Sequence, residues 1–250
     1  MVSFNDVVVI IPHYSHTETL SLLIAELGGF FDIFVVNDGP NDLILKEAFV
    51  LKSDGVGFSQ ATNLGIAYAQ SKGKKWVFVL NDDAFISKPS FENLLSNVQK
   101  VGIYSPVLIT ENKMCFGFKV SSWGRVKEIK NEFTKPKALC GAALLMPSWL
   151  RFNADFIHGM EDVELSLRIK DLGFYLEVKK DVFAFHKEGQ TVSKDSYRAQ
   201  KGASFGQMYL FPKYTFTVTI LSIVQILKEQ RNVRLRLSAV KEALVLFQNR

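Results

Sequence analysis

Three polar residues, Asn81, Asp82 and Asp83, directly follow an apolar run that extends from Val77 to Leu80. A run of Val, Phe and Leu without alternation is typical of a strand covered on both faces, as in a parallel sheet. Open α/β sheets bind their ligands at the carboxyl ends of such strands. Oxygen ligands there suit Mg²⁺ or Mn²⁺, and such an ion could hold a diphosphate. A plain polar turn would explain the same residues, so on their own they leave both interpretations open.

Other groups that could do chemistry lie where strands are expected to end or helices to begin. Asp38 follows an apolar run, and His186 follows the last one before the C-terminal region. Glu161 and Asp162 open a helical pattern. Strand ends converge on one rim of a sheet, so we expect these groups to gather there. The structural alternatives are an Asx-turn for Asp38, helix capping for Asp162 and ordinary packing for His186.

The hydrophobic pattern of the first hundred residues predicts alternating strands and helices. This order is typical of a doubly wound, mostly parallel sheet. Strands are expected at 7–11, 33–36 and 77–80, and helices at 17–27, 41–49, about 59–70 and about 90–100.

From residue 103 onward the alternation is less regular and predicts a partly antiparallel excursion. We expect one α/β domain over residues 1–200, followed by a basic, amphipathic helical tail over residues 201–250. Strands are expected near 103–109, 114–120, 124–130, 139–146, 174–178 and 182–185, and a helix at 161–172.

The net charge of +5 arises from the tail. Residues 201–250 contain eight Lys or Arg and two Asp or Glu, whereas residues 1–200 are nearly neutral. The tail lacks the aromatic and glycine-rich readers of the usual nucleic-acid-binding modules, so we expect no nucleic-acid partner. Its apolar segment 216–227 and basic flank predict either contact with an anionic membrane or packing against protein, including a homodimer.

Composition favours a globular protein, with 48% hydrophobic and 22% charged residues. No stretch is long enough to span a bilayer, and the first residues lack the basic and apolar regions of a signal peptide. Cys115 and Cys140 fit a reducing compartment and offer no metal-binding spacing. We therefore expect a cytoplasmic protein, with the inner face of the plasma membrane as the place where the tail would act.

Five short motifs occur in order along the chain. They are Pro12-His-Tyr-Ser15, Val35-Val-Asn-Asp-Gly39, Gly57-Phe-Ser-Gln-Ala-Thr-Asn-Leu-Gly65, Leu80-Asn-Asp-Asp83 and Gly159-Met-Glu-Asp-Val-Glu-Leu-Ser-Leu-Arg168. In order and spacing they resemble the motifs of family 2 inverting glycosyltransferases, most closely the bacterial rhamnosyltransferase-like branch. The resemblance covers residues 6–190 and implies the GT-A fold. It also implies sugar transfer from a nucleoside-diphosphate donor to a glycan or lipid-linked oligosaccharide acceptor.

The resemblance implies a set of donor-binding residues. Pro12, Tyr14 and Asp38 match positions that hold the base and ribose, and a carboxylate can accept the N3–H of uracil or thymine. Asn63 matches a donor-site asparagine, although a helix residue bonded to the backbone is the alternative. Pro40 departs from the family, which usually has Ser there, so this turn could be shaped differently.

The resemblance also assigns the metal and the general base. Asn81 and Asp83 match the outer positions of the Asp-x-Asp motif, with Asp83 as the direct ligand of Mg²⁺ or Mn²⁺ and His186 as a second ligand. Asp82 is a further donor-site residue. Asp162 matches the catalytic base that takes a proton from the acceptor hydroxyl, and Glu161 would orient the acceptor or the backbone.

Other functions are less well supported by the sequence. A sugar nucleotidyltransferase would carry a glycine-rich, basic phosphate loop near the first strand, and the segment after residue 11 provides none. An inactive GT-A interaction domain would not be expected to keep Asp38, Asp83, Asp162 and His186 together. No Gly-x-Gly-x-x-Gly follows the first strand, as a Rossmann dehydrogenase would require.

Overall fold

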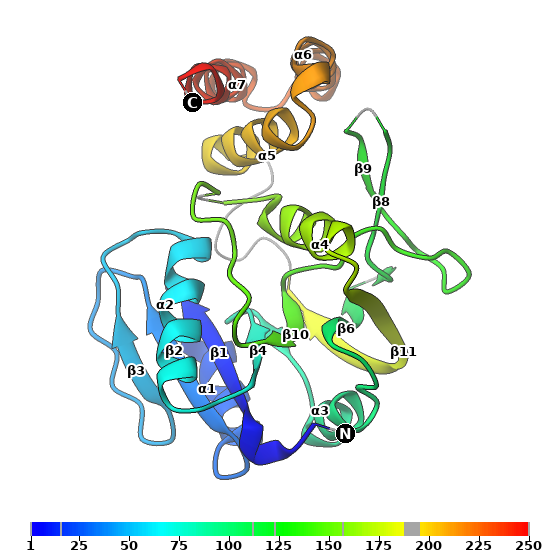
Figure 1. Ribbon diagram of the computed structural model, residues 1–250. Helices are drawn as coiled ribbons and strands as arrows, with labels where there is room; N and C mark the ends of the chain where they lie inside the picture. The colour runs from blue at the N-terminus through cyan, green and yellow to red at the C-terminus, as the bar shows by residue number, and fades with distance from the viewer. Residues whose placement is uncertain are drawn as a thin grey trace.

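A mixed β-sheet with helices on both faces forms the body of the protein, and three further helices are stacked at one end of it (Figure 1). The computed structural model describes residues 2–15, 17–111, 113–122, 124–156, 158–187 and 196–249. The strands are β1 (Val7–His13), β2 (Asp32–Asn37), β3 (Phe49–Lys52), β4 (Trp76–Leu80), β5 (Ala84–Phe85), β6 (Gly102–Thr110), β7 (Lys113–Cys115), β8 (Phe118–Val120), β9 (Val126–Glu128), β10 (Ala143–Pro147) and β11 (Tyr175–His186). The helices are α1 (Thr17–Leu27), α2 (Phe58–Ser71), α3 (Lys88–Ser96), α4 (Glu161–Asp171), α5 (Tyr197–Leu210), α6 (Thr215–Glu229) and α7 (Val233–Gln248), with short 3₁₀ turns η1 (Phe4–Asp6) and η2 (Pro212–Tyr214).

The main sheet has the strand order β3-β2-β1-β4-β10-β6-β11-β5, and β7 pairs with β6. Its first four strands are parallel, as the alternating pattern predicted. Strand β10 then lies antiparallel to both β4 and β6. The sheet is therefore mixed rather than mostly parallel, because the chain passes through the β8–β9 hairpin and re-enters the sheet from the opposite direction.

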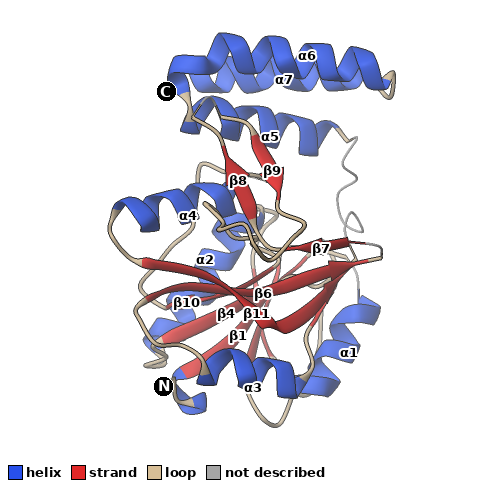
Figure 2. Ribbon diagram, turned by 90° about the vertical axis from the view of Figure 1, so that its right-hand side faces the viewer, coloured by secondary structure: helices blue, strands red, loops and turns tan. Residues whose placement is uncertain are grey.

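Strand β1 is buried on both faces, which explains its unbroken apolar sequence. Val7, Val9 and Ile11 pack on one face with α1 and α3, whereas Val8 and Ile10 pack on the other with α2 and α4. Figure 2 shows these two pairs of helices on opposite sides of the sheet. The arrangement is the one expected of a covered α/β sheet.

The predicted helix at 41–49 is wrong. No helix occupies this segment, and Phe49 instead begins β3, which pairs with β2. The Phe49 ring stacks on Tyr68, with ring centroids 4.7 Å apart, and also contacts Phe34. Contacts with residues distant in sequence have thus decided a segment whose local pattern was ambiguous.

Two other strand predictions change in detail. The single strand expected at 114–120 is divided between β7 and β8, with Gly117 between them at a φ of +87°. The two strands expected at 174–178 and 182–185 are one bent strand, β11, whose register to β6 shifts between Lys179 and Phe183. The shift is a bulge, which bends a strand without ending it.

Helices α5, α6 and α7 form the layer at the end of the molecule, referred to below as the helical layer. The predicted boundary between residues 200 and 201 falls inside α5. None of the described helices is by itself long and apolar enough to cross a membrane. Helix α5 and the segment Pro212–Glu229 reach that length and composition together, but they are bent by 114° at their junction.

Candidate active site

Hydrogen bonds join the ends of β1, β2 and β4 at one rim of the sheet. The Asp38 backbone N–H donates to the His13 carbonyl oxygen over 2.8 Å. The His13 Nδ1 atom lies 2.8 Å from Asp82 Oδ2, and the Tyr14 N–H donates to the same oxygen over 3.3 Å. Pro12 lies in β1, and the Tyr14 side chain is exposed beside the strand end. The expected convergence of the strand ends is therefore observed.

The carboxylate of Asp38 is buried and fully engaged by the loop that precedes α2. Its Oδ1 accepts hydrogen bonds from Ser53 Oγ at 2.7 Å and from the Val56 N–H at 2.9 Å, and its Oδ2 accepts one from the Gly57 N–H at 2.9 Å. Each carboxylate oxygen has two lone pairs, so Oδ2 retains capacity for one more donor such as a base N–H.

Asp83 and His186 lie together, as the sequence predicted, with 3.2 Å between Asp83 Oδ1 and His186 Nε2. The antiparallel pairing of β11 with β5 places His186 opposite Ala84. Residues 188–195, which carry the loop after His186, lie outside the described part of the chain.

Two oxygens at this rim fit a divalent ion. Asn81 Oδ1 is buried and accepts no hydrogen bond within the described structure, and the buried Asp83 Oδ1 has the contact with His186 Nε2 at 3.2 Å but no hydrogen bond there. Within the described ranges, no three His, Cys, Asp or Glu side chains gather into a metal-binding group. Asp83, Asn81 and His186 are thus a partial set, which suits an ion that also takes phosphate oxygens and water as ligands.

Gly141 and Ala142 connect this rim to Asp162, the predicted general base. The Asn81 N–H donates to the Ala142 carbonyl oxygen over 2.9 Å, and the Gly141 N–H donates to Asp162 Oδ2 over 2.9 Å. An added Cβ on Gly141 would meet the Asp162 Cβ at 3.0 Å, so the two segments are closely packed. Asp162 therefore lies beside the end of β4, although 81 and 162 are far apart in sequence.

Glu161 and Asp162 differ in their surroundings. Asp162 Oδ1 also accepts a hydrogen bond from the Val163 N–H at 2.8 Å, so both of its oxygens face backbone donors. Glu161 Oε2 is buried without a partner. Burial, and secondly the negative charge of Asp162, raise the pKa of Glu161 to about 8. Burial also raises the pKa of Asp162, against the lowering effect of its backbone donors. Asp162 is therefore the member of the pair that ionises first, and Glu161 keeps its proton at neutral pH.

A strained turn precedes the two carboxylates. Gly159 has a φ of +86°, and Met160 has a φ of +70°, which is uncommon for a residue with a side chain. Helix α5 packs directly against this turn. An added Cβ on Gly202 would overlap the His158 carbonyl oxygen, and one on Gly206 would meet the Met160 Cβ at 2.5 Å. Two glycines thus allow α5 to support the turn that precedes Glu161 and Asp162.

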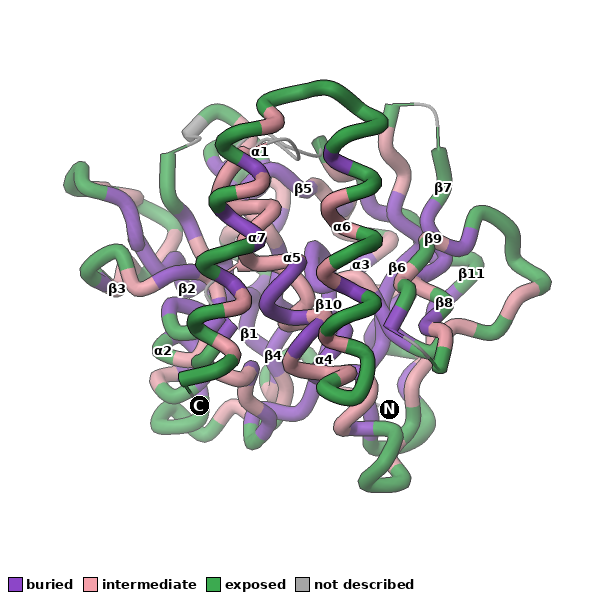
Figure 3. The backbone as a smooth tube through the Cα atoms, turned by 90° about the horizontal axis from the view of Figure 1, so that it is seen from above, coloured by how far each residue is buried: buried purple, intermediate pink, exposed green. Residues whose placement is uncertain are grey.

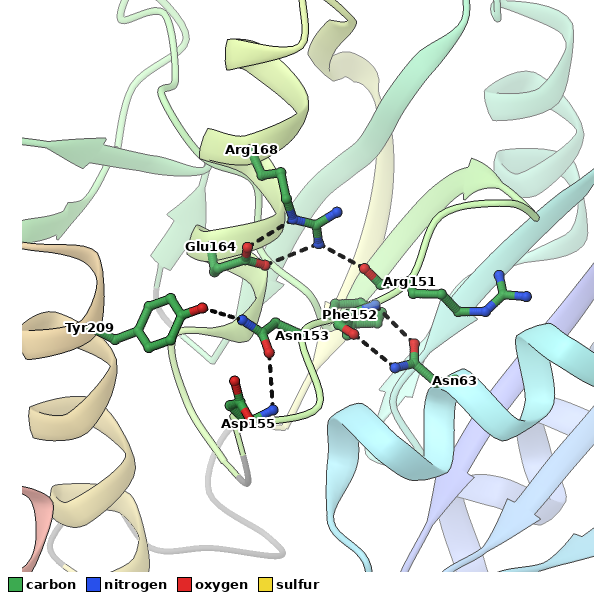
Figure 4. Close-up of polar contacts among 8 residues, drawn as sticks. All are labelled: Asn63, Arg151, Phe152, Asn153, Asp155, Glu164, Arg168 and Tyr209. Atoms are coloured by element: carbon green, nitrogen blue, oxygen red, sulfur yellow. Dashed lines mark hydrogen bonds and ion pairs between the residues drawn. The ribbon is translucent and has the colours of Figure 1, made fainter. Parts of the chain in front are cut away.

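A second polar network holds α2, α4 and α5 around the segment 151–155 (Figure 4). The Asn63 amide makes two hydrogen bonds with the backbone of Phe152, at 2.8 and 2.9 Å. These bonds favour a positioning role for Asn63, and its expected donor contact stays a prediction. The ion pair of Arg168 with Glu164 and the contact of Asn153 with Tyr209 complete the network.

Sequence reasoning gave too little weight to three groups. His13 connects β1 to Asp82, and its place between Pro12 and Tyr14 was the available signal. The charge of Arg198 acts on both Glu161 and His158. The Gly202-x-x-x-Gly206 spacing is typical of a helix that approaches another segment closely, and the structure shows that approach.

Residues 8–142 match the model of glycosyl transferase family 2. The chain belongs to this family. The match contains the rim residues from Pro12 to Asp83, whereas Glu161, Asp162 and His186 lie beyond its end. No curated protein sequence matches the chain.

Solved structures show the fold of this family member. A crystal structure of GalNAc-T7 with UDP, GalNAc and Mn²⁺ matches with a TM-score of 0.63 and 14% identity, covering 80% of this chain and 47% of GalNAc-T7. The chain thus spans about half the length of that protein. The inositol-1-phosphate CTP transferase from T. maritima matches with a TM-score of 0.49 and 12% identity, covering 76% of this chain and 92% of that one. The expectations of family membership and of the GT-A fold are confirmed, and the rhamnosyltransferase-like branch stays a prediction.

Proposed function

We propose that this protein is an inverting glycosyltransferase that moves a sugar from a UDP- or dTDP-sugar, with dTDP-rhamnose as one candidate, to a hydroxyl of a surface glycan or lipid-linked oligosaccharide. The observation that carries the proposal is the link from Asn81 through Ala142 and Gly141 to Asp162. It brings a carboxylate that can accept a proton to the rim where an α/β sheet of this type holds its ligand.

The proposed base is Asp162. Its two backbone hydrogen bonds favour the ionised form, which can take the proton of the acceptor hydroxyl as that oxygen attacks the anomeric carbon. Glu161, protonated at neutral pH, would donate a hydrogen bond to the acceptor and orient it. A single base opposite the departing diphosphate is the arrangement that inversion requires.

The proposed donor site lies on the other side of the rim. Asp38 would accept the N3–H of a pyrimidine base, with Pro12 and Tyr14 beside the base and ribose. Asp82 positions this end of β1 through His13 and Tyr14. Asp83, Asn81 and His186 would hold Mg²⁺ or Mn²⁺, which would supply Lewis-acid stabilisation of the diphosphate.

Isothermal titration calorimetry with UDP, dTDP and GDP, each with and without Mn²⁺, tests the donor site. We expect metal-dependent binding of one pyrimidine diphosphate, at least tenfold weaker in Asp83→Ala and unchanged in Asp54→Ala, an exposed control. Absence of binding under every condition would contradict the proposal and favour an interaction domain. Formation of a nucleotide sugar from UTP or CTP and a sugar phosphate would favour a nucleotidyltransferase instead.

A further inference from the structure

Helix α6 exposes a row of large apolar side chains along one side. Phe216, Ile220, Val224 and Leu227 are 79%, 43%, 41% and 52% exposed. Their spacing of three or four residues places them on one face of the helix. We call this row the α6 stripe.

The opposite side of α6 is the one that packs inside the helical layer. Val218 and Ile226 are buried there against Met208 of α5 and Val240 of α7. The helix is therefore held by one face, and the α6 stripe is additional apolar surface that the fold of the chain leaves in water. Contiguous exposed patches of this kind mark interaction sites.

The helical layer has an excess of basic residues, and both acidic residues of its described part form ion pairs. Glu229 pairs with Arg236 at 2.6 Å, and Glu242 pairs with Lys201 at 2.9 Å. The surface charge that remains is therefore strongly positive. Five other basic residues of the described layer are exposed, and Arg198 of α5 is half-buried. The exposed ones are Lys213, Lys228, Arg231, Arg234 and Lys241.

The helical layer lies beside the catalytic turn. Helices α6 and α7 are the outermost elements of the protein, and α5 separates them from α4 and the body (Figure 1). Viewed from above, their outward surface is largely exposed (Figure 3). Since α5 packs on His158 and Met160, only one helix lies between the outer surface and the turn before Glu161.

We propose that the α6 stripe and its basic surroundings bind the surface of an anionic lipid bilayer. Apolar side chains would enter the boundary between head groups and acyl chains, and the basic residues would contact the acidic head groups. A second copy of the chain fits less well, because an interface formed by the same patch on both subunits would bring two positive surfaces together. Resting on the proposed function, this placement would bring the catalytic pair to a lipid-linked acceptor.

Co-sedimentation of the full chain with vesicles tests the proposal. We expect at least tenfold stronger partitioning onto phosphatidylcholine vesicles containing 30% phosphatidylglycerol than onto pure phosphatidylcholine, with the difference reduced in high salt. The double variant Phe216→Glu/Val224→Glu should lose this binding. Arg234→Glu/Lys241→Glu, which leaves the stripe intact, should weaken it by about tenfold.

The controls separate this inference from the donor-site proposal. Ile44→Glu replaces an apolar residue that is 93% exposed outside the helical layer, and it should bind vesicles like the unmodified chain. The circular dichroism spectrum and the nucleotide affinity should be unchanged in every variant. The membrane proposal and the donor-site proposal can therefore fail independently of each other. The inference would be overturned by equal binding to both vesicle types or by no vesicle binding. It would also be overturned if the unmodified chain formed a dimer, bound no vesicles, and became a monomer in Phe216→Glu/Val224→Glu.

Discussion

The two carboxylate sites of this protein, Asp38 and the Glu161–Asp162 pair, have opposite surroundings. Asp38 follows a parallel strand, and each of its oxygens accepts hydrogen bonds from one adjoining loop. The Glu161–Asp162 pair follows two residues with positive φ, and Glu161 keeps a buried oxygen without a partner.

This difference between Asp38 and the Glu161–Asp162 pair shows how one rim of a sheet can combine ligand binding with proton transfer. A carboxylate whose two oxygens both accept hydrogen bonds from one loop is held in position, which suits recognition of a ligand. Two carboxylates in adjacent positions, partly withdrawn from water, have raised pKa values, which suits proton transfer near neutral pH. The strained turn before them persists because α5 packs against it.

The largest effect is expected at the base itself. Asp162→Asn should lower the turnover rate by about 10³-fold, or roughly 4 kcal/mol, because an amide cannot take the acceptor proton. Donor affinity should not change. Single-turnover kinetics and calorimetry measure the two quantities, and Asp171→Asn, exposed at the other end of α4, is the control. An active Asp162→Asn beside an inactive Glu161→Gln would transfer the role of base to Glu161.

Next in size is the support that α5 gives to the catalytic turn. Gly202→Ala should lower the free energy of unfolding by about 2–3 kcal/mol, because the added methyl overlaps the His158 carbonyl oxygen and α5 must move. Urea unfolding measures this change. The control Gln207→Ala, on the same helix, should change the free energy of unfolding by less than about 0.5 kcal/mol. Equal stability of the two variants would mean that α5 and the turn are not closely packed.

A smaller effect is expected on the donor side. Asp38→Asn should lower the free energy of unfolding by about 2 kcal/mol, because an amide group would face the N–H donors of Val56 and Gly57. Binding of a pyrimidine diphosphate should weaken as well. Asp54→Asn, in the same loop and exposed, should change neither quantity. A destabilised variant with unaltered nucleotide affinity would limit Asp38 to a structural role.

A separate effect is a dependence of stability on pH. Folded Glu161 holds its proton up to a pKa of about 8, whereas an unfolded glutamate loses it near its usual value of about 4.3. The folded state therefore binds more protons in this window, so stability should fall as pH rises through it. Urea unfolding between pH 5 and 8 should show a flatter dependence in Glu161→Gln. An unchanged slope would contradict the raised pKa.

Local patterns in the sequence determined most of the secondary structure. The unbroken apolar run from Val7 to Ile11 is buried on both faces, as predicted, and the helix expected at 17–27 is α1. These features depend on periodicity and on residues that start or stop a helix, all within a few positions of one another. The strand ends that carry Asp38 and Asp83 could be predicted for the same reason.

Only the tertiary structure decided the contacts between distant segments. It placed β10 antiparallel beside β4, made a strand of 49–52 and occupied the Asn63 amide with Phe152, 89 positions away. It also gave Glu161 and Asp162 different partners, which adjacent carboxylates in a sequence do not reveal. The fold brings the Gly141 N–H to Asp162, whereas one oxygen of Glu161 is buried without a partner. A sequence pattern specifies which groups are present, whereas their pKa and partners depend on burial and on neighbours that only the folded chain supplies.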